Sequence, residues 1–290
     1  PEGKKSKISV VQNLPKNNIE ENIKFIKKTV KKIKSFEQAE LIVFPELSLT
    51  GLEKPHKRGI KINSHLITDL CNFAMKCKTY IIVGFCEIKD NNFYNSTIIL
   101  GEEGIIGCYR KTHLSEKDKN WATPGEKLDF FDLKIGRIGI SVGNENLYPE
   151  ISRILSIFGC DLIVAPSALS GNFTGINEGT SIPHNYPIPT GYDPNHWHLM
   201  RVRGGENNVF VAFSNVISKK INMFGKSGIF GPETFSFPRK ESNILDKKGF
   251  VTMEIDTESK SKILLENPVK RKDMLTMRLP HHYYHLINKN

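Results

Sequence analysis

Apolar residues recur along the chain at two spacings, one typical of strands and one of helices. Short apolar runs predict strands over residues 7–12, 41–44, 80–84, 92–100, 105–110, 137–142, 161–165, 208–213, 227–230, 233–237 and 250–255. Apolar residues three and four positions apart predict helices over residues 19–33, 64–76, 148–158 and 194–206. Strands and helices alternate, with several strands directly following one another. This order predicts an α/β chain with a mixed sheet covered by helices in layers.

The chain shows no boundary that would divide it. Its 290 residues contain no linker rich in Gly, Ser or Pro, no internal repeat and no low-complexity block. We therefore expect one domain over residues 1–290. The long segment from 169 to 193 carries Gly and Pro in quick succession, and loops of this length are usually functional or disordered.

Charge and composition exclude several classes of protein. The net charge is +10, but the first predicted helix carries its lysines on a solvated face, and no basic stripe interleaves with aromatics. We therefore expect no nucleic-acid partner. No apolar run approaches the roughly 20 residues that span a bilayer, so no membrane association is expected. The five cysteines are odd in number, lack metal-type spacing and mostly lie in apolar runs, which favours a reduced, cytoplasmic protein.

Three positions follow predicted strands and carry the candidate chemistry. Glu46 follows the run Leu41-Ile-Val-Phe-Pro, Lys111 follows Cys108-Tyr-Arg, and Gly143 follows Ile138-Gly-Ile-Ser-Val. Catalytic groups of α/β proteins are usually presented where strands end. A carboxylate and an ammonium in one pocket shift each other's pKa, although a structural ion pair would use the same two residues.

The stretches around these positions resemble the nitrilase superfamily of carbon–nitrogen hydrolases. The resemblance rests on Glu40-Leu-Ile-Val-Phe-Pro-Glu-Leu-Ser-Leu-Thr-Gly51, Tyr109-Arg-Lys-Thr-His-Leu114 and Arg137-Ile-Gly-Ile-Ser-Val-Gly-Asn-Glu-Asn-Leu-Tyr-Pro-Glu-Ile-Ser-Arg153. Further support comes from residues 161–168, 203–207 and 278–283, in the order and spacing of the family.

The resemblance implies an α-β-β-α sandwich, usually assembled as a homodimer or higher homo-oligomer, and a Glu-Lys-Cys catalytic set with no cofactor. In that set Glu46 corresponds to the general base and Lys111 to the group that stabilises the oxyanion. A cysteine thiolate attacks an amide or nitrile carbon and forms a covalent intermediate.

The chain departs from the family pattern at two positions. Gly143 stands where the nucleophilic cysteine is expected, and Asp118 stands at the second acidic position, with Glu116 as a nearby competitor. Glu145 and Trp197 are the expected substrate-binding residues. Aromatic residues of the 169–193 segment are further candidates for the pocket: Phe173, Tyr186 and Tyr192.

Other residues are weaker candidates for the missing role. Ser141 lies two positions before Gly143 and so on the same strand face, but it sits further back along the strand. Cys160 is expected to pack in the core, and Cys108, three residues before Lys111 along a strand, is expected to face the other side. His196 and His198 point apart on a predicted helix, so no metal site is expected.

Three functions remain open. The first is a protein that has lost covalent amidase chemistry and binds a small amide-, nitrile- or carboxylate-like molecule. The second is an active hydrolase of carbon–nitrogen bonds that uses Ser141 or a water activated by Glu46. The third is a structural or partner-binding subunit.

Overall fold

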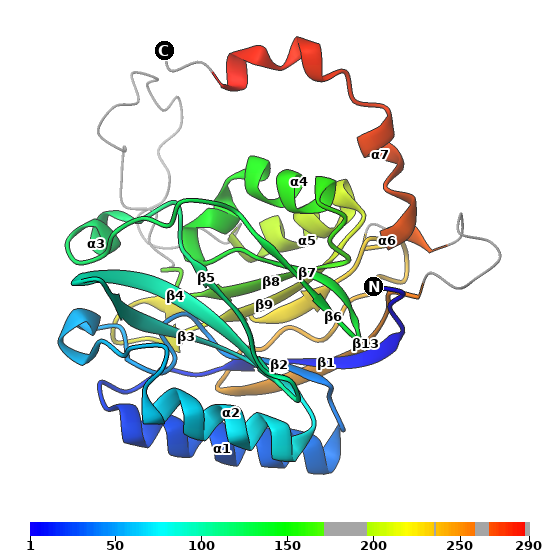
Figure 1. Ribbon diagram of the computed structural model, residues 1–290. Coiled ribbons are helices and arrows are strands. Elements are labelled where there is room, and N and C mark those ends of the chain that lie inside the picture. The colour runs from blue at the N-terminus through cyan, green and yellow to red at the C-terminus, as the bar shows by residue number, and fades with distance from the viewer. Residues whose placement is uncertain (171–195, 235, 259–266, 288–290) are drawn as a thin grey trace.

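Two β-sheets lie face to face in the computed structural model, with helices covering the outer face of each (Figure 1). The structure describes residues 1–170, 196–234, 236–258 and 267–287. The four layers follow the order α-β-β-α, which is the layered α/β arrangement that the resemblance implied.

The first sheet has six strands in the order β13-β1-β2-β3-β4-β5. The strands β1, β2 and β3 are parallel to one another, and the other neighbours are antiparallel, so the sheet is mixed. Their bounds are β13 (Gly249–Asp256), β1 (Lys5–Gln12), β2 (Leu41–Val43), β3 (Tyr80–Lys89), β4 (Asn92–Gly101) and β5 (Gly104–Arg110).

The second sheet has five strands in the order β12-β9-β8-β7-β6. Their bounds are β12 (Gly228–Phe230), β9 (Phe210–Asn215), β8 (Leu162–Ser167), β7 (Gly136–Ile140) and β6 (Phe130–Leu133). A separate antiparallel pair, β10 (Ile217–Ser218) and β11 (Met223–Phe224), forms a short hairpin.

Helices α1 and α2 cover the first sheet, and α4 and α5 cover the second (Figure 1). The α-helices are α1 (Ile19–Phe36), α2 (His65–Cys77), α3 (Glu116–Lys119), α4 (Pro149–Ile157), α5 (His196–Asn207), α6 (Pro268–Arg271) and α7 (Asp273–Thr276). Short 3-10 turns are η1 (Pro55–Arg58), η2 (Gly143–Leu147), η3 (Pro280–His282) and η4 (Tyr284–Leu286).

The continuous apolar runs form strands because both faces of each sheet are buried. In β2, Leu41 and Val43 belong to the core between the sheets, whereas Ile42 belongs to the core under α1 and α2. In β8, Leu162 faces the first of these cores and Ile163 the core under α4 and α5. Side chains alternate across a strand, so a strand covered on both sides needs apolar residues at every position.

One predicted strand was wrong, and several short elements were not predicted, among them α3, β6, β10 and β11. Residues 233–237 were expected to form a strand, but the described ones lie in turns, where Thr234 N–H donates to the Gly231 carbonyl at 3.2 Å. The edge strand β6 was missed, because its short sequence carries a charge and pairs only with β7. Among the described residues, no helix is long and apolar enough to cross a membrane.

Candidate active site

Glu46 is carried by a tight turn that presses against β3. It follows β2 directly, and Gly84 in β3 allows the turn to approach. A Cβ at Gly84 would lie 2.5 Å from the Leu47 nitrogen and 3.2 Å from the Glu46 Cα. The turn is fixed there by the Leu49 N–H, which donates to the Gly84 carbonyl at 2.9 Å. A side chain at position 84 would therefore displace the Glu46 carboxylate.

Lys111 stands at the end of β5, next to Asn95 of β4. The Lys111 backbone N–H donates to the Asn95 carbonyl at 2.9 Å, which sets the register of the two side chains. The Lys111 ammonium donates to Glu46 Oε1 at 2.9 Å and to Asp118 Oδ2 at 2.7 Å. The two carboxylates therefore share one buried cation.

Asp118 reaches this cation from α3, and the start of that short helix holds it. The Ser115 hydroxyl donates to Asp118 Oδ2 at 2.7 Å, and the Ser115 backbone N–H donates to the same oxygen at 3.1 Å. Asn95 Nδ2 donates to both carboxylates, at 2.8 Å to Glu46 Oε1 and 3.3 Å to Asp118 Oδ1. Asp118, rather than the nearby and exposed Glu116, thus joins Glu46 and Lys111.

The three charged side chains are almost fully buried, and their pKa values respond to this. Burial raises the pKa of Glu46 above its ordinary value, and the attraction of Lys111 does not cancel that effect. Burial alone would lower the pKa of Lys111, but the two carboxylates raise it instead. Burial alone would raise the pKa of Asp118, but Lys111 lowers it. Of the two carboxyls, Glu46 therefore holds a proton more readily.

Gly143 faces this cluster from the turn after β7. Its φ of +56° lies in the left-handed region, which glycine adopts without strain. An added Cβ would lie 2.5 Å from Glu46 Oε2 and 3.0 Å from Lys111 Nζ. Glu46 Oε2 is itself held by the Ala168 backbone N–H at 2.9 Å. The Glu46 carboxylate therefore occupies the space that a side chain at position 143 would need.

Glu145 was expected to bind substrate, but in the structure its side chain is fully buried among protein donors. Its Oε2 accepts from the Val142 N–H at 2.8 Å. Its Oε1 accepts from the Tyr109 hydroxyl, the Thr112 hydroxyl and N–H, and the His113 N–H. Glu145 thus ties the Gly143 turn to the segment that carries Lys111, which is a positioning role.

Trp197 also lies away from the cluster. It packs against the core under α4 and α5, stacks on His198 with ring centroids 3.8 Å apart, and lies beside the Arg201 guanidinium. It does not line the cavity over Lys111. The other aromatic candidates, Phe173, Tyr186 and Tyr192, and most of the 169–193 segment, lie outside the described residues.

A cavity of about 540 Å³ opens over Glu46, Lys111 and Asp118. Its described lining includes Trp121 and Asn144, which the sequence reasoning passed over, and Asn95 lies directly beneath it. Asn144 could have been predicted from the sequence, since it adjoins Gly143. Asn95 and Trp121 could not, because only strand pairing and the turn after α3 bring these two residues to the site.

The alternative nucleophiles Ser141, Cys108 and Cys160 are not activated by their surroundings. The Ser141 hydroxyl is buried without a hydrogen-bond partner among the described residues, so no base contacts it. Burial raises the pKa of both Cys108 and Cys160 to about 12, which keeps these thiols protonated. Cys160 packs in the core under α4, as expected from its position.

Comparison with known proteins decides the family. The profile of the family described as carbon-nitrogen hydrolase matches residues 7–256. The chain belongs to this family. It is 30% identical over 229 residues to a nitrilase of Pyrococcus abyssi, an alignment that covers 76% of this chain and 77% of the relative.

Solved structures share the fold of this carbon-nitrogen hydrolase family member. A carbon-nitrogen hydrolase of Helicobacter pylori G27 superposes with a TM-score of 0.78 at 19% identity, covering 98% of this chain and 99% of the other. A mutant amidase of Nesterenkonia sp. AN1 superposes with a TM-score of 0.75 at 15% identity, covering 98% of each chain. In that mutant amidase, the acetamide moiety of fluoroacetamide is attached covalently at the active-site cysteine.

The crowding at Gly143 predicts the cost of adding a side chain. Gly143→Ala should reduce the free energy of unfolding by about 1–2 kcal/mol for the left-handed backbone. A further loss of about 1.5–3 kcal/mol should arise because the Glu46 carboxylate must leave the Ala168 N–H. Urea denaturation measures both losses together.

Gly159→Ala is the matched control for this prediction. Gly159 also has a positive φ, of +81°, but its nearest heavy atom to an added Cβ is the flexible Arg137 Nη1 at 3.7 Å. Only the backbone cost applies there. Equal losses for the two variants would contradict the collision with Glu46.

The raised pKa of Glu46 predicts how stability changes with pH. Because folded Glu46 binds its proton more tightly than the unfolded chain does, wild-type stability should fall as pH rises above the ordinary glutamate pKa of 4.5. Glu46→Gln removes that contribution. Its free energy of unfolding, measured relative to wild type by urea denaturation, should therefore improve from pH 4 to pH 8.

Glu87 gives a control of opposite sign. Burial alone would raise its pKa, but hydrogen bonds from Arg110 and Ser96 lower it below 4.5. The ionised form therefore stabilises the fold above that pH, and stability is lost as pH falls. The free energy of unfolding of Glu87→Gln should therefore decrease relative to wild type as pH rises. Parallel trends for the two variants would show that the pKa of Glu46 is not raised in the folded protein.

Proposed function

We propose that this carbon-nitrogen hydrolase family member binds a small amide- or carboxylate-like molecule over Lys111 and lacks normal covalent amidase activity. One observation carries the proposal. Gly143, the residue at the expected nucleophile position, has no side chain, and the Glu46 carboxylate lies 2.5 Å from where its Cβ would be. The rest of the catalytic set, Glu46, Lys111 and Asp118, remains together at the bottom of a cavity.

The related Nesterenkonia amidase supports this assignment by contrast. In the mutant of that amidase, the covalent adduct is on the active-site cysteine. In the present chain the same chemistry would need a thiolate beside Glu46 and Lys111, and none of the five cysteines forms a hydrogen bond with either residue. Binding through Lys111 needs no nucleophile, because an ammonium attracts a carbonyl oxygen with or without a later reaction.

The alternative is slow hydrolysis by water. Glu46 would take a proton from the water, and Lys111 would stabilise the oxyanion. Both oxygens of Glu46 already accept hydrogen bonds, and burial keeps the carboxyl protonated over a wider pH range. The third hypothesis is a structural or partner-binding subunit. The open cavity over Lys111 does not favour this hypothesis.

Turnover separates binding from catalysis. Purified wild-type protein should hydrolyse simple amides, N-carbamoyl compounds and nitriles far below 1 s⁻¹, the lower end of ordinary enzymatic rates. Loss of a covalent nucleophile typically lowers the rate by a factor on the order of 10⁴–10⁶. The release of ammonia measures the rate of hydrolysis. A wild-type turnover of about 1 s⁻¹ or more would contradict the proposal.

A pair of cysteine variants tests whether the remaining groups still form a catalytic site. Gly143→Cys should form a covalent adduct with fluoroacetamide, visible by mass spectrometry, once Glu46 has shifted. Gly159→Cys places a thiol at another glycine with positive φ, away from Lys111, and should react only at the rate of an ordinary thiol. Equal labelling of the two variants would contradict the assignment of position 143.

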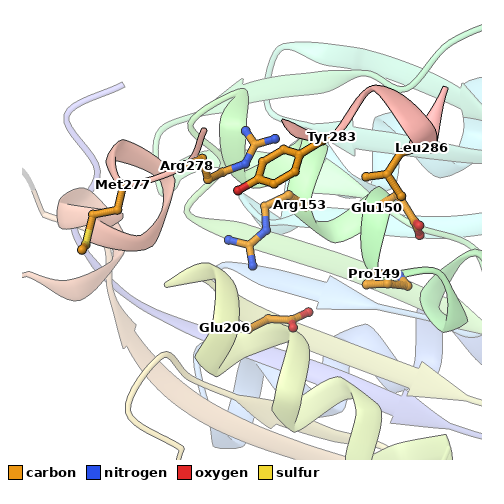
Figure 2. Close-up of a pocket in the computed structure, with 8 residues that line it drawn as sticks. All are labelled: Pro149, Glu150, Arg153, Glu206, Met277, Arg278, Tyr283 and Leu286. Atoms are coloured by element: carbon orange, nitrogen blue, oxygen red, sulfur yellow. The ribbon is translucent and has the colours of Figure 1, made fainter. Parts of the chain in front are cut away.

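We also propose that two copies of the chain pair through the side of the molecule that carries α4, α5 and the C-terminal segment 277–287. That segment arches away from the body above α4 (Figure 1) and exposes most of its apolar side chains. Beneath it lies a cavity of about 410 Å³ whose lining combines apolar and charged groups (Figure 2). Its described lining comprises Pro149, Glu150, Arg153, Glu206, Met277, Arg278, Tyr283 and Leu286.

The pairing proposal predicts a change in molecular mass. Leu286 is 70% exposed and lines this cavity, so Leu286→Asp should convert dimers to monomers in sedimentation equilibrium. Phe36→Asp is the control, because Phe36 is 74% exposed at the end of α1, under the other sheet. A monomeric wild type, or equal effects of the two variants, would refute the pairing.

Two further properties are proposed from the sequence. We place the protein in the cytoplasm, with support from its five free cysteines. One domain over residues 1–290 likewise remains a prediction.

A further inference from the structure

The cavity over Lys111 has a charged floor and an apolar wall. The floor consists of Glu46, Lys111 and Asp118. The wall is assembled from segments far apart in the sequence: the turn after Glu46, the turn after α3, the end of η2, the segment after β8 and the β10–β11 hairpin. Its apolar members are Leu52, Trp121, Leu147, Leu169, Ile221 and Met223.

The floor is suited to a neutral polar group. Lys111 has three N–H bonds and uses two of them on Glu46 Oε1 and Asp118 Oδ2, which leaves one for a ligand oxygen. The floor holds two carboxyls and one ammonium. An additional carboxylate would lie next to the Asp118 carboxylate, whose pKa Lys111 lowers, in a region of low water content where like charges repel strongly. An uncharged amide offers an oxygen to Lys111 without that repulsion.

The wall is suited to a hydrocarbon chain. Its apolar side chains offer no charge and, apart from the Trp121 indole N–H, no hydrogen-bonding group. The uncharged polar residues of the described lining are Ser115, Asn144 and Ser170. The charged residues of the lining away from the floor are Glu53, Glu116 and Lys117 at the exposed rim. Glu116 is paired with Lys119 at 2.6 Å, and Glu53 accepts from Asn17 at 3.1 Å. A ligand that reaches from the floor past the wall would therefore gain affinity by burying apolar surface.

We propose that this pocket selects uncharged amides that carry an apolar chain of several carbons, and that it excludes the carboxylic acids that hydrolysis of those amides would release. The proposal rests on the function proposed above and narrows its ligand class. Ile221, at the tip of the β10–β11 hairpin, acts here as a specificity residue. It is 44% exposed and forms part of the wall.

The test measures dissociation constants by calorimetry, with the linear amides from acetamide to hexanamide as probes, at pH 7.5. Affinity should rise about fourfold with each methylene group that enters the wall region. Pentanoate should bind at least tenfold more weakly than pentanamide. Pentan-1-ol, which has the chain but not the amide, should also bind at least tenfold more weakly.

A matched pair of variants locates the effect in the wall. Ile221→Ser should flatten the dependence on chain length, with a three- to tenfold loss for hexanamide and no change for acetamide. Ile105→Ser is the control, since Ile105 is 43% exposed at the start of β5 and does not line this cavity. Ile105→Ser should show the same dependence of affinity on chain length as the wild-type protein.

The outcomes separate this inference from the function on which it rests. If amides bind but affinity does not depend on chain length, or if pentanoate matches pentanamide, the inference is wrong and the binding function stands. Equal losses in the two variants would also overturn the role of Ile221. If no amide binds and no turnover is seen, the proposed function fails, and this inference fails with it.

Discussion

The structure of this site depends on one buried ammonium held between two carboxylates. Lys111 lies between Glu46 and Asp118 with little access to water, and removing charges from water costs more than a single ion pair returns. The surrounding fold supplies the remaining stabilisation through directed donors. Asn95, Ser115 and the Ala168 N–H complete the hydrogen bonds of the two carboxylates. Each donor comes from a different element, so the cluster forms only when both sheets are in place.

The same crowding explains why the turn after β7 can hold a glycine. Glu46 accepts the Ala168 N–H and thereby lies over the Cα of Gly143, where any side chain would meet it. The positive φ at this position adds a second reason for glycine. The absence of a side chain there thus agrees with the packing around it. Glu145 secures this arrangement from behind, because one buried carboxylate joins the Gly143 turn to the residues that follow Lys111.

One cavity combines a charged floor and an apolar wall. The floor holds the Lys111 ammonium between Glu46 and Asp118, and the wall carries apolar side chains. This division follows from the layers. The floor grows from strand ends that the sheets hold rigidly, whereas the wall is built from turns and a hairpin, which tolerate change at lower cost to the fold.

The sequence by itself determined the layered α/β fold, the family and the three positions at which strand ends carry Glu46, Lys111 and Gly143. These are local signals, since buried strands show as apolar runs and the motifs are contiguous. The roles of Glu145, Asn95 and Trp121 were decided only by the tertiary structure. The sequence of a turn does not show whether its carboxylate faces a ligand or protein donors. Glu145 accepts hydrogen bonds from five protein donors. Asn95 reaches Glu46 because antiparallel pairing of β4 with β5 places it beside Lys111, and the strand sequence does not state which residues will face each other.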